Sequence, residues 1–283
     1  MTNDLFDMTA LMRNRRRARQ MSEPALFLHE LAADQVSERL TEVNRQFISP
    51  AVVTAFPDVW AKVLPGIKTV TEADLLDFEP GAHDLVIHAL SLHWSNDPVG
   101  QMIQCRNALK PDGLFMGVMF GGRSLQELRA SLAEAESRLS GGLSPRVAPM
   151  AELRDLGGLL MRAGLALPVA DGEIVPVTYS SLPALIAELR AMGETNALKG
   201  RVKGFSARSL FDEAAKIYAD NFSTPEGRLS ATVEMIYLTG WAPSETQRQP
   251  LRPGSAQARL ADVLGTKEHA AGDLATNPDQ RKP

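Results

Sequence analysis

The chain has 283 residues, of which 44% are hydrophobic and 23% charged, a composition typical of a globular protein with one large or two small domains. A formal net charge of −4 and the lack of an apolar run near the roughly 20 residues that span a bilayer argue against nucleic-acid binding and a membrane span. The single cysteine, Cys105, excludes an internal disulfide, and we expect a cytoplasmic location.

Residues 1–24 form a polar arm that carries a run of arginines between residues 13 and 19. Such a run is most often the solvated face of a helix, but it could instead fold over a site or contact an acidic partner. Apolar spacing predicts a helix over about 28–47, and residues 51–56 suit a first strand. Pro57 then favours a short helix over 58–64, followed by a short strand over 67–71.

The centre of the chain follows the pattern strand, loop, helix, turn, strand. A buried strand is expected over 84–88, and the loop after it carries His93 and Trp94. A helix over 98–110 and a Lys-Pro-Asp-Gly turn at 110–113 lead into an apolar strand over 114–120. Ligands of open α/β sheets bind where the carboxyl ends of strands meet loops, so the loop after residue 88 is the first candidate site.

The rest of the chain continues to alternate. Helices are expected over 125–139 and about 150–163, strands over 167–169 and 173–177, further helices between 182 and 222, and a last strand over 232–241. This alternation predicts an α/β three-layer sandwich with a mostly parallel sheet, in one domain over 25–245. A helical insertion at about 180–230 is expected to form a lid before the last strand. The polar composition of 246–283 predicts a flexible tail.

A series of short motifs in a fixed order identifies a family. These motifs are the run 84–98, Lys-Pro-Asp-Gly at 110–113, Met-Phe-Gly-Gly at 119–122, Leu-Gln-Glu-Leu at 125–128, Gly-Leu-Ser-Pro at 142–145, Asp-Leu-Gly at 155–157, Arg-Ala-Gly at 162–164, Met-Gly-Glu at 192–194 and Leu-Thr-Gly-Trp at 238–241. Over about residues 5–260 the chain resembles the S-adenosylmethionine-dependent methyltransferase-like proteins related to the mitochondrial complex I assembly factor of methyltransferase type. These are cousins of the malonyl-carrier methyltransferase of biotin synthesis.

The resemblance implies a Rossmann-like class I methyltransferase fold with S-adenosylmethionine as cofactor. It implies a protein side chain or a small molecule as methyl acceptor, with a respiratory-complex subunit among the partners. It also places the cofactor beside two stretches of the chain. The cofactor-binding residues expected from it are Glu72, Asp74, Leu75, Ala89, Leu90 and Trp94.

Each candidate has an ordinary structural alternative. Glu72 and Asp74 would accept a hydrogen bond from the adenine amino group, or would be solvated loop acids. His93 is the catalytic candidate, as a base near neutral pH or a group that orients the substrate, or else it packs with Trp94 to close the core. Asp84, His88 and Cys105 are expected to be structural, and no His or Cys spacing suggests a metal site.

One departure from the family pattern weakens the enzymatic interpretation. Family members carry a glycine-rich loop after the first strand, which lets the backbone approach the cofactor closely, whereas residues 51–57 contain no glycine. The alternative is therefore a degenerate member that no longer methylates and acts as a binding or assembly protein. Loss of an internal segment of the gene is a third explanation. The sequence leaves open the acceptor, the oligomeric state and the role of the helical insertion.

Overall fold

The computed structural model describes residues 4–245, 247 and 260–266. The chain divides into a large unit, Met1–Glu245, and a second unit, Thr246–Pro283, in which the described part includes the short helix α9 (Leu260–Leu264). Most of the tail expected to be flexible, 246–283, lies outside the described residues. In the part of the chain that the structure describes, no helix has the length and apolar character needed to cross a membrane, and no cluster of acidic, His or Cys residues is suited to hold a metal ion.

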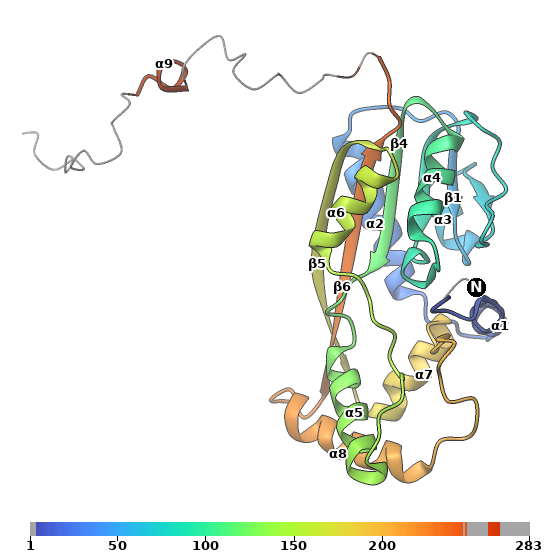
Figure 1. The fold of residues 1–283 in the computed structure, drawn as a ribbon, viewed down its shortest axis with the longest axis vertical. Helices are drawn as coiled ribbons and strands as arrows, with labels where there is room; N and C mark the ends of the chain where they lie inside the picture. Colours follow the sequence, from blue (N-terminus) through green and yellow to red (C-terminus); the bar gives the residue numbers. More distant parts are fainter. Residues whose placement is uncertain (1–3, 246, 248–259, 267–283) are drawn as a thin grey trace, which may run out of the picture. The chain divides into compact units, whose positions relative to one another are not determined.

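A six-stranded sheet forms the centre of the large unit, in the order β2-β1-β3-β4-β6-β5 (Figure 1). Its strands are β1 (Pro50–Val53), β2 (Lys68–Val70), β3 (His83–Ala89), β4 (Leu109–Phe120), β5 (Ala166–Tyr179) and β6 (Leu229–Trp241). The pairs β1–β2, β1–β3 and β3–β4 are parallel, whereas β6 runs antiparallel to both β4 and β5. Every residue of β3 is buried, which suits the central strand of a sheet that is covered on both faces.

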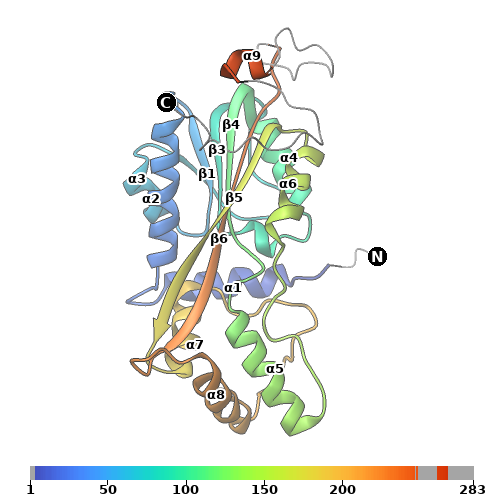
Figure 2. The same ribbon diagram turned by 90° about the vertical axis from the view of Figure 1, so that its left-hand side faces the viewer.

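Helices cover both faces of this sheet, which confirms the expected α/β sandwich (Figure 2). One face is covered by α2 (Phe27–Glu42) and α3 (Pro57–Val63), whose Val36 and Trp60 pack in one core with Ile87. The other face is covered by α4 (Pro98–Ala108) and α6 (Leu153–Arg162), where Met102 and Leu160 form a second core with the sheet. The two cores hold the strand ends in fixed positions, and the candidate site is built there.

A third core lies beyond the parallel half of the sheet. β6 pairs with β4 only from residue 235 onward, so residues 229–234 continue as a two-stranded ribbon with β5. Three helices pack on this ribbon: α5 (Gln126–Ser140), α7 (Leu182–Met192) and α8 (Arg208–Phe222) (Figure 1). The expected insertion at 180–230 contains α7 and α8, and α5 joins them although it precedes β5 in the chain.

Two local expectations were wrong. Residues 110–113, expected as a turn, lie within β4, where the N–H of Asp112 donates to the carbonyl of Ala242. They form an irregularity in the pairing with β3 between Leu109 and Leu114, and the left-handed conformation of Asp112 (φ 62°) accompanies it. The strands expected at 167–169 and 173–177 form the single strand β5. Asp171 and Gly172, which interrupt the apolar pattern, still pair with β6, so the ladder continues through them.

Candidate functional site

The strands β1, β2 and β3 end side by side, and we call this border of the sheet, made by residues 54–57, 72–75 and 89–94, the cofactor edge. The segment after β1 carries larger side chains where the family pattern has glycines. The Phe56 ring is 4% exposed and packs on the ring of His29, with 4.5 Å between ring centres. Burial lowers the pKa of His29 to about 3, so this ring is neutral.

The acidic residues after β2 differ in their surroundings. Asp74 is exposed, and its backbone carbonyl accepts hydrogen bonds from the side chains of Gln101 and Gln104. The Leu75 side chain is 82% exposed and does not line the cofactor edge. The Glu72 side chain points inward, and burial raises the pKa of this carboxyl. Of the three expected residues in this stretch, only Glu72 is placed where it faces the interior of the edge.

The loop after β3 brings the other expected residues together. Ala89 and Leu90 are buried, and Leu90 takes a left-handed conformation (φ 50°) just before the short 3₁₀ helix η1 (Leu92–Trp94). The indole Nε1 of Trp94 donates a hydrogen bond of 2.6 Å to Oε2 of Glu194. His93 Nε2 lies 3.3 Å from the same oxygen. The expected packing of His93 against Trp94 is present, with 5.7 Å between the ring centres.

A buried charged group completes the edge; we call Arg15, Glu72, His93, Trp94 and Glu194 the Glu194 cluster. Glu72, His93 and Trp94 were expected at the site, whereas Arg15 and Glu194 were not. Arg15 lies on α1 (Met8–Arg19), is 2% exposed, and places Nη2 2.7 Å from Oε1 of Glu194. Burial alone would raise the pKa of Glu194, but Arg15, His93 and the hydrogen bonds outweigh it and lower the pKa to about 2. Glu194 belongs to the Met-Gly-Glu motif at 192–194, and Arg15 belongs to the arginine run that was expected to form a solvated helix face or to fold over a site.

With α1 in place, the cofactor edge does not fit S-adenosylmethionine. The cavity there measures about 20 Å³ and is lined by residues of the edge and by Met8 and Leu11 of α1. Small-molecule and cofactor sites usually measure about 300–1,000 Å³. The Arg15 guanidinium takes part of the missing space, because its Nη2 donates to the carbonyl oxygen of Leu90 at 2.9 Å.

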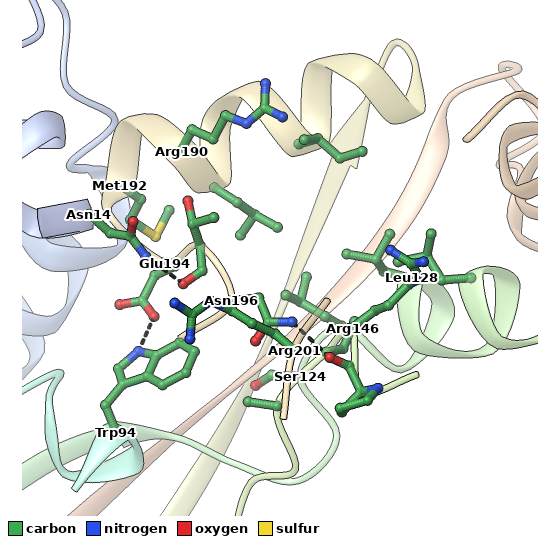
Figure 3. A pocket seen from close by; sticks show the side chains of 18 of the residues that line it. Asn14, Trp94, Ser124, Leu128, Arg146, Arg190, Met192, Glu194, Asn196 and Arg201 are labelled. Carbon is green, nitrogen blue, oxygen red and sulfur yellow. Dashed lines mark hydrogen bonds between the residues drawn. The ribbon is translucent and has the colours of Figure 1, made fainter. Parts of the chain in front are cut away.

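A larger cavity of about 450 Å³ opens beside the cofactor edge, between α1, α5, α7 and the loops at 145–150 and 194–206. Figure 3 shows Trp94 and Glu194 at one end of it and Leu128 at the other. Its walls are largely apolar, and they include Leu28, Leu125, Leu128, Leu132, Ile186, Leu189 and Phe211. We call it the arginine pocket, because it is also lined by Arg13, Arg17, Arg146, Arg190 and Arg201.

The five arginines of this pocket are not equivalent. Arg146 is bound by the Glu136 carboxylate at 2.7 Å, and Arg201 is bound by Asp7 at 2.9 Å. The hydrogen bonds from Arg146 and Ser144 outweigh burial and lower the pKa of Glu136 to about 2. Arg13, Arg17 and Arg190 are exposed and make no ion pair with any described residue. Sequence reasoning missed this pocket because its arginines lie far apart along the chain.

Comparison with known proteins decides the family. A family model described as a methyltransferase domain matches residues 27–117. The human protein named arginine-hydroxylase NDUFAF5, mitochondrial, is 30% identical over 290 residues, which cover 93% of this chain and 84% of the relative. The chain belongs to the NDUFAF5 family. The zebrafish (Danio rerio) NDUFAF5 is 34% identical, with 81% of this chain and 71% of the relative covered.

One further relative agrees with the relationship that the motifs predicted for this NDUFAF5 family member. The malonyl-[acyl-carrier protein] O-methyltransferase of Laribacter hongkongensis is 33% identical over 70% of this chain and 63% of the relative. A solved structure of a putative methyltransferase from Bacillus halodurans is 10% identical with a TM-score of 0.45, covering 74% of this chain and 99% of that one. The chain therefore has the methyltransferase-like identity that its motifs predicted, and its methyltransferase domain supports S-adenosylmethionine as the cofactor of the family.

Proposed function

We propose that the chain is an S-adenosylmethionine-dependent methyltransferase whose acceptor binds in the arginine pocket. The observation that carries this proposal is the position of the pocket, which meets the cofactor edge at Trp94 and Glu194. Methyl transfer requires little acid–base help and depends mainly on positioning and on exclusion of water. Apolar walls and buried aromatic side chains supply both. His93, held by Glu194 and packed on Phe120 at 4.9 Å, acts in this proposal as a positioning residue.

The charges of the pocket favour an acceptor with an anionic group and an apolar part. Arg13, Arg17 and Arg190 would attract the negative charge, while the leucines of α5 and α7 would contact the apolar part. The names of several relatives point to an arginine side chain as their substrate. A second guanidinium would be repelled by the arginines here, and the acid of this pocket, Glu194, is already paired with Arg15. A small anionic molecule or an acidic protein segment is the acceptor that we propose.

A second function is favoured by the cofactor edge itself. The absence of glycine at 51–57 and the buried Arg15 are both expected of a family member that binds partners without methylating them. A respiratory-complex subunit, which the family resemblance implies, would be the protein partner in that case. The cellular compartment of the protein is also a proposal. The NDUFAF5 relatives are named as mitochondrial, whereas the single buried cysteine of this chain favours a reducing compartment such as the cytoplasm.

Transfer of a labelled methyl group tests the first function. The full chain is incubated with millimolar S-adenosylmethionine carrying a tritiated methyl group, and with medium-chain fatty acids, acidic peptides or arginine-containing peptides. We expect label only in the anionic acceptors. Arg190→Gln should raise the KM for the acceptor about threefold, and Arg154→Gln, an exposed arginine outside the pocket, should leave it unchanged. Label in the arginine peptides alone would contradict the proposed acceptor, and no label in any mixture would favour the binding function.

A further inference from the structure

A side chain of the protein itself, that of Arg15 on α1, lies in the cofactor edge. We infer that α1 is a built-in plug, which places the Arg15 guanidinium at the cofactor edge, and that S-adenosylmethionine binds there only when α1 withdraws. The identity of the competing ligand rests on the proposed function. The position of Arg15 rests on the structure alone.

Arg15 touches all three strand ends that make the edge. Beyond β1, its guanidinium carbon lies 5.8 Å from the centre of the Phe56 ring. Beyond β2, its Nε lies 3.8 Å from Oε2 of Glu72, and beyond β3 its Nη2 donates to the carbonyl of Leu90. Its Nη1 also donates to the carbonyl of Met192 at 3.3 Å. One side chain from a remote helix therefore occupies the place where the strand ends converge.

The groups around Arg15 are acceptors, and they select a cation that donates hydrogen bonds. Two carboxylates, Glu72 and Glu194, and two backbone carbonyls surround the guanidinium. S-adenosylmethionine carries a positively charged sulfonium, a positively charged amino group and several hydroxyl and amino donors, so it offers the same chemistry as Arg15. Glu72 Oε1 is buried and accepts no hydrogen bond from the described residues. Oε1 of Glu194 likewise accepts no well-aligned hydrogen bond from the described residues, although Nη2 of Arg15 lies 2.7 Å away, so the plug leaves two acceptors incompletely satisfied.

Withdrawal of α1 would enlarge the cavity at the cofactor edge, in addition to removing the positive charge of Arg15 from it. The small cavity is walled on one side by Met8 and Leu11 of α1 and on the other by residues of the edge. Arg13 and Arg17, on the same helix, line the arginine pocket. Withdrawal of α1 would therefore take away the wall of the small cavity and one wall of the large pocket together, which joins the edge to the acceptor site.

The contacts of α1 suit a reversible plug. The side chains that α1 buries are Ala10, Leu11, Arg15 and Ala18, so only one large apolar side chain of the helix is fully covered. Withdrawal of α1 would expose Glu72 and Glu194 to water, and solvation of the freed carboxylates would offset part of the ion-pair attraction that is lost. The start of the helix is fixed by Asp7, which caps it through the N–H of Ala10 and pairs with Arg201. A soluble cation that satisfies the same acceptors can therefore compete with Arg15.

Calorimetric titration of the full chain with S-adenosylmethionine tests the plug. We expect Arg15→Met to bind the cofactor at least tenfold more tightly than the unmodified protein. Arg16→Met, which changes an exposed arginine of the same helix, should bind as the unmodified protein does. Equal micromolar binding by all three proteins would overturn the inference, because α1 would then be no obstacle. No binding to a folded Arg15→Met protein would also overturn it, because the edge would be closed without the plug.

A second variant covers the case in which Arg15→Met does not fold. Asp7→Ala loosens the start of α1 and leaves the Glu194 cluster intact, so it should also tighten cofactor binding, and unchanged affinity in this folded variant would count against the plug. Hydrogen exchange supplies an independent readout, because the α1 amides should exchange faster at saturating cofactor. Binding by the variants without methylation of any acceptor would leave the plug standing and contradict the proposed function. Methylation by the unmodified protein at micromolar cofactor would contradict the plug and support the proposed function.

Discussion

Replacing Glu194 by glutamine should lower the free energy of unfolding by about 3–5 kcal/mol, because it leaves a buried guanidinium without its closest counterion. Glutamine keeps the size of the side chain and still offers an oxygen to the indole of Trp94. It removes the charge that lies 2.7 Å from Arg15, and the next carboxylate, Glu72, is 3.8 Å away. The variant therefore isolates the electrostatic part of the Glu194 cluster from its packing.

The pKa shift of Glu194 gives a similar estimate of the stability that its negative charge contributes. Its pKa in the folded protein is about 2, against an ordinary value of 4.5, and this difference corresponds to about 3 kcal/mol of stability near neutral pH. Because the folded pKa is the lower one, this stability is present above about pH 4.5 and is lost as the pH falls toward 2. Burial raises the pKa of Glu72, whose contribution has the opposite sign. The charge of Glu194 is one of the causes that raise the pKa of Glu72, so Glu194→Gln also lessens this opposing contribution.

Denaturant and thermal unfolding, followed by circular dichroism and tryptophan fluorescence, measure this effect. A loss of 3–5 kcal/mol should lower the Tm by roughly 6–20 °C in a unit of this size. Glu134→Gln is the control, because Glu134 pairs with Arg138 on the exposed face of α5 and should change stability by less than about 1 kcal/mol. A loss below about 1 kcal/mol for Glu194→Gln, or a loss that persists unchanged at pH 2, would refute the argument that Arg15 is buried against this carboxylate.

Three further predictions concern stability and reactivity. Cys105 is buried in α4, and burial raises the pKa of its thiol. A thiol reagent such as dithionitrobenzoate should therefore react with it only as the protein unfolds. Rapid reaction under native conditions would contradict the buried position of Cys105. Asp84→Ala should cost about 1–3 kcal/mol in thermal unfolding, because its carboxylate accepts two backbone N–H groups before β1 at 2.7 and 2.9 Å. Gly193→Ala should destabilise the native state, since its φ is +81° and a Cβ would lie 2.9 Å from Arg15 Cδ; an unchanged Tm would show that α7 ends differently.

The fold could be predicted where the local pattern and the tertiary structure agree. The apolar run at 84–88 predicts β3, and the helix expected from residue 98 is α4; both lie as expected, and the structure shows that Asp97 caps α4. The motif order identified the family because it spans most of the chain. β5 was divided in two because it is an edge strand that is largely exposed, so its composition lacks the apolar alternation of a covered strand. Its continuity depends on pairing with β6, which no local pattern records.

The candidate site was harder to predict than the fold. The loop after β3 could be found because strand ends of α/β sheets are usual ligand positions. Arg15 could not be singled out, since it is one of five arginines between residues 13 and 19, and only the docking of α1 decides which of them is buried. Glu194 meets Arg15 across most of the length of the chain. Contacts at such separation depend on the complete fold, so the sequence indicated that the arginine run could fold over a site but neither which arginine is buried there nor the arginine pocket.

The ribbon of β5 and β6 that extends past β4 gives the protein a modular construction. The helices that carry Leu128, Leu189 and Phe211 stand on this ribbon, whereas the cofactor edge stands on the parallel half of the sheet. Substitutions on α5 and α8 that alter the pocket wall should therefore leave the register of β1, β3 and β4 untouched, and their effects should add to those of changes at the edge. Acceptor preference can in this way diverge among related chains while the strand ends and their loops stay the same.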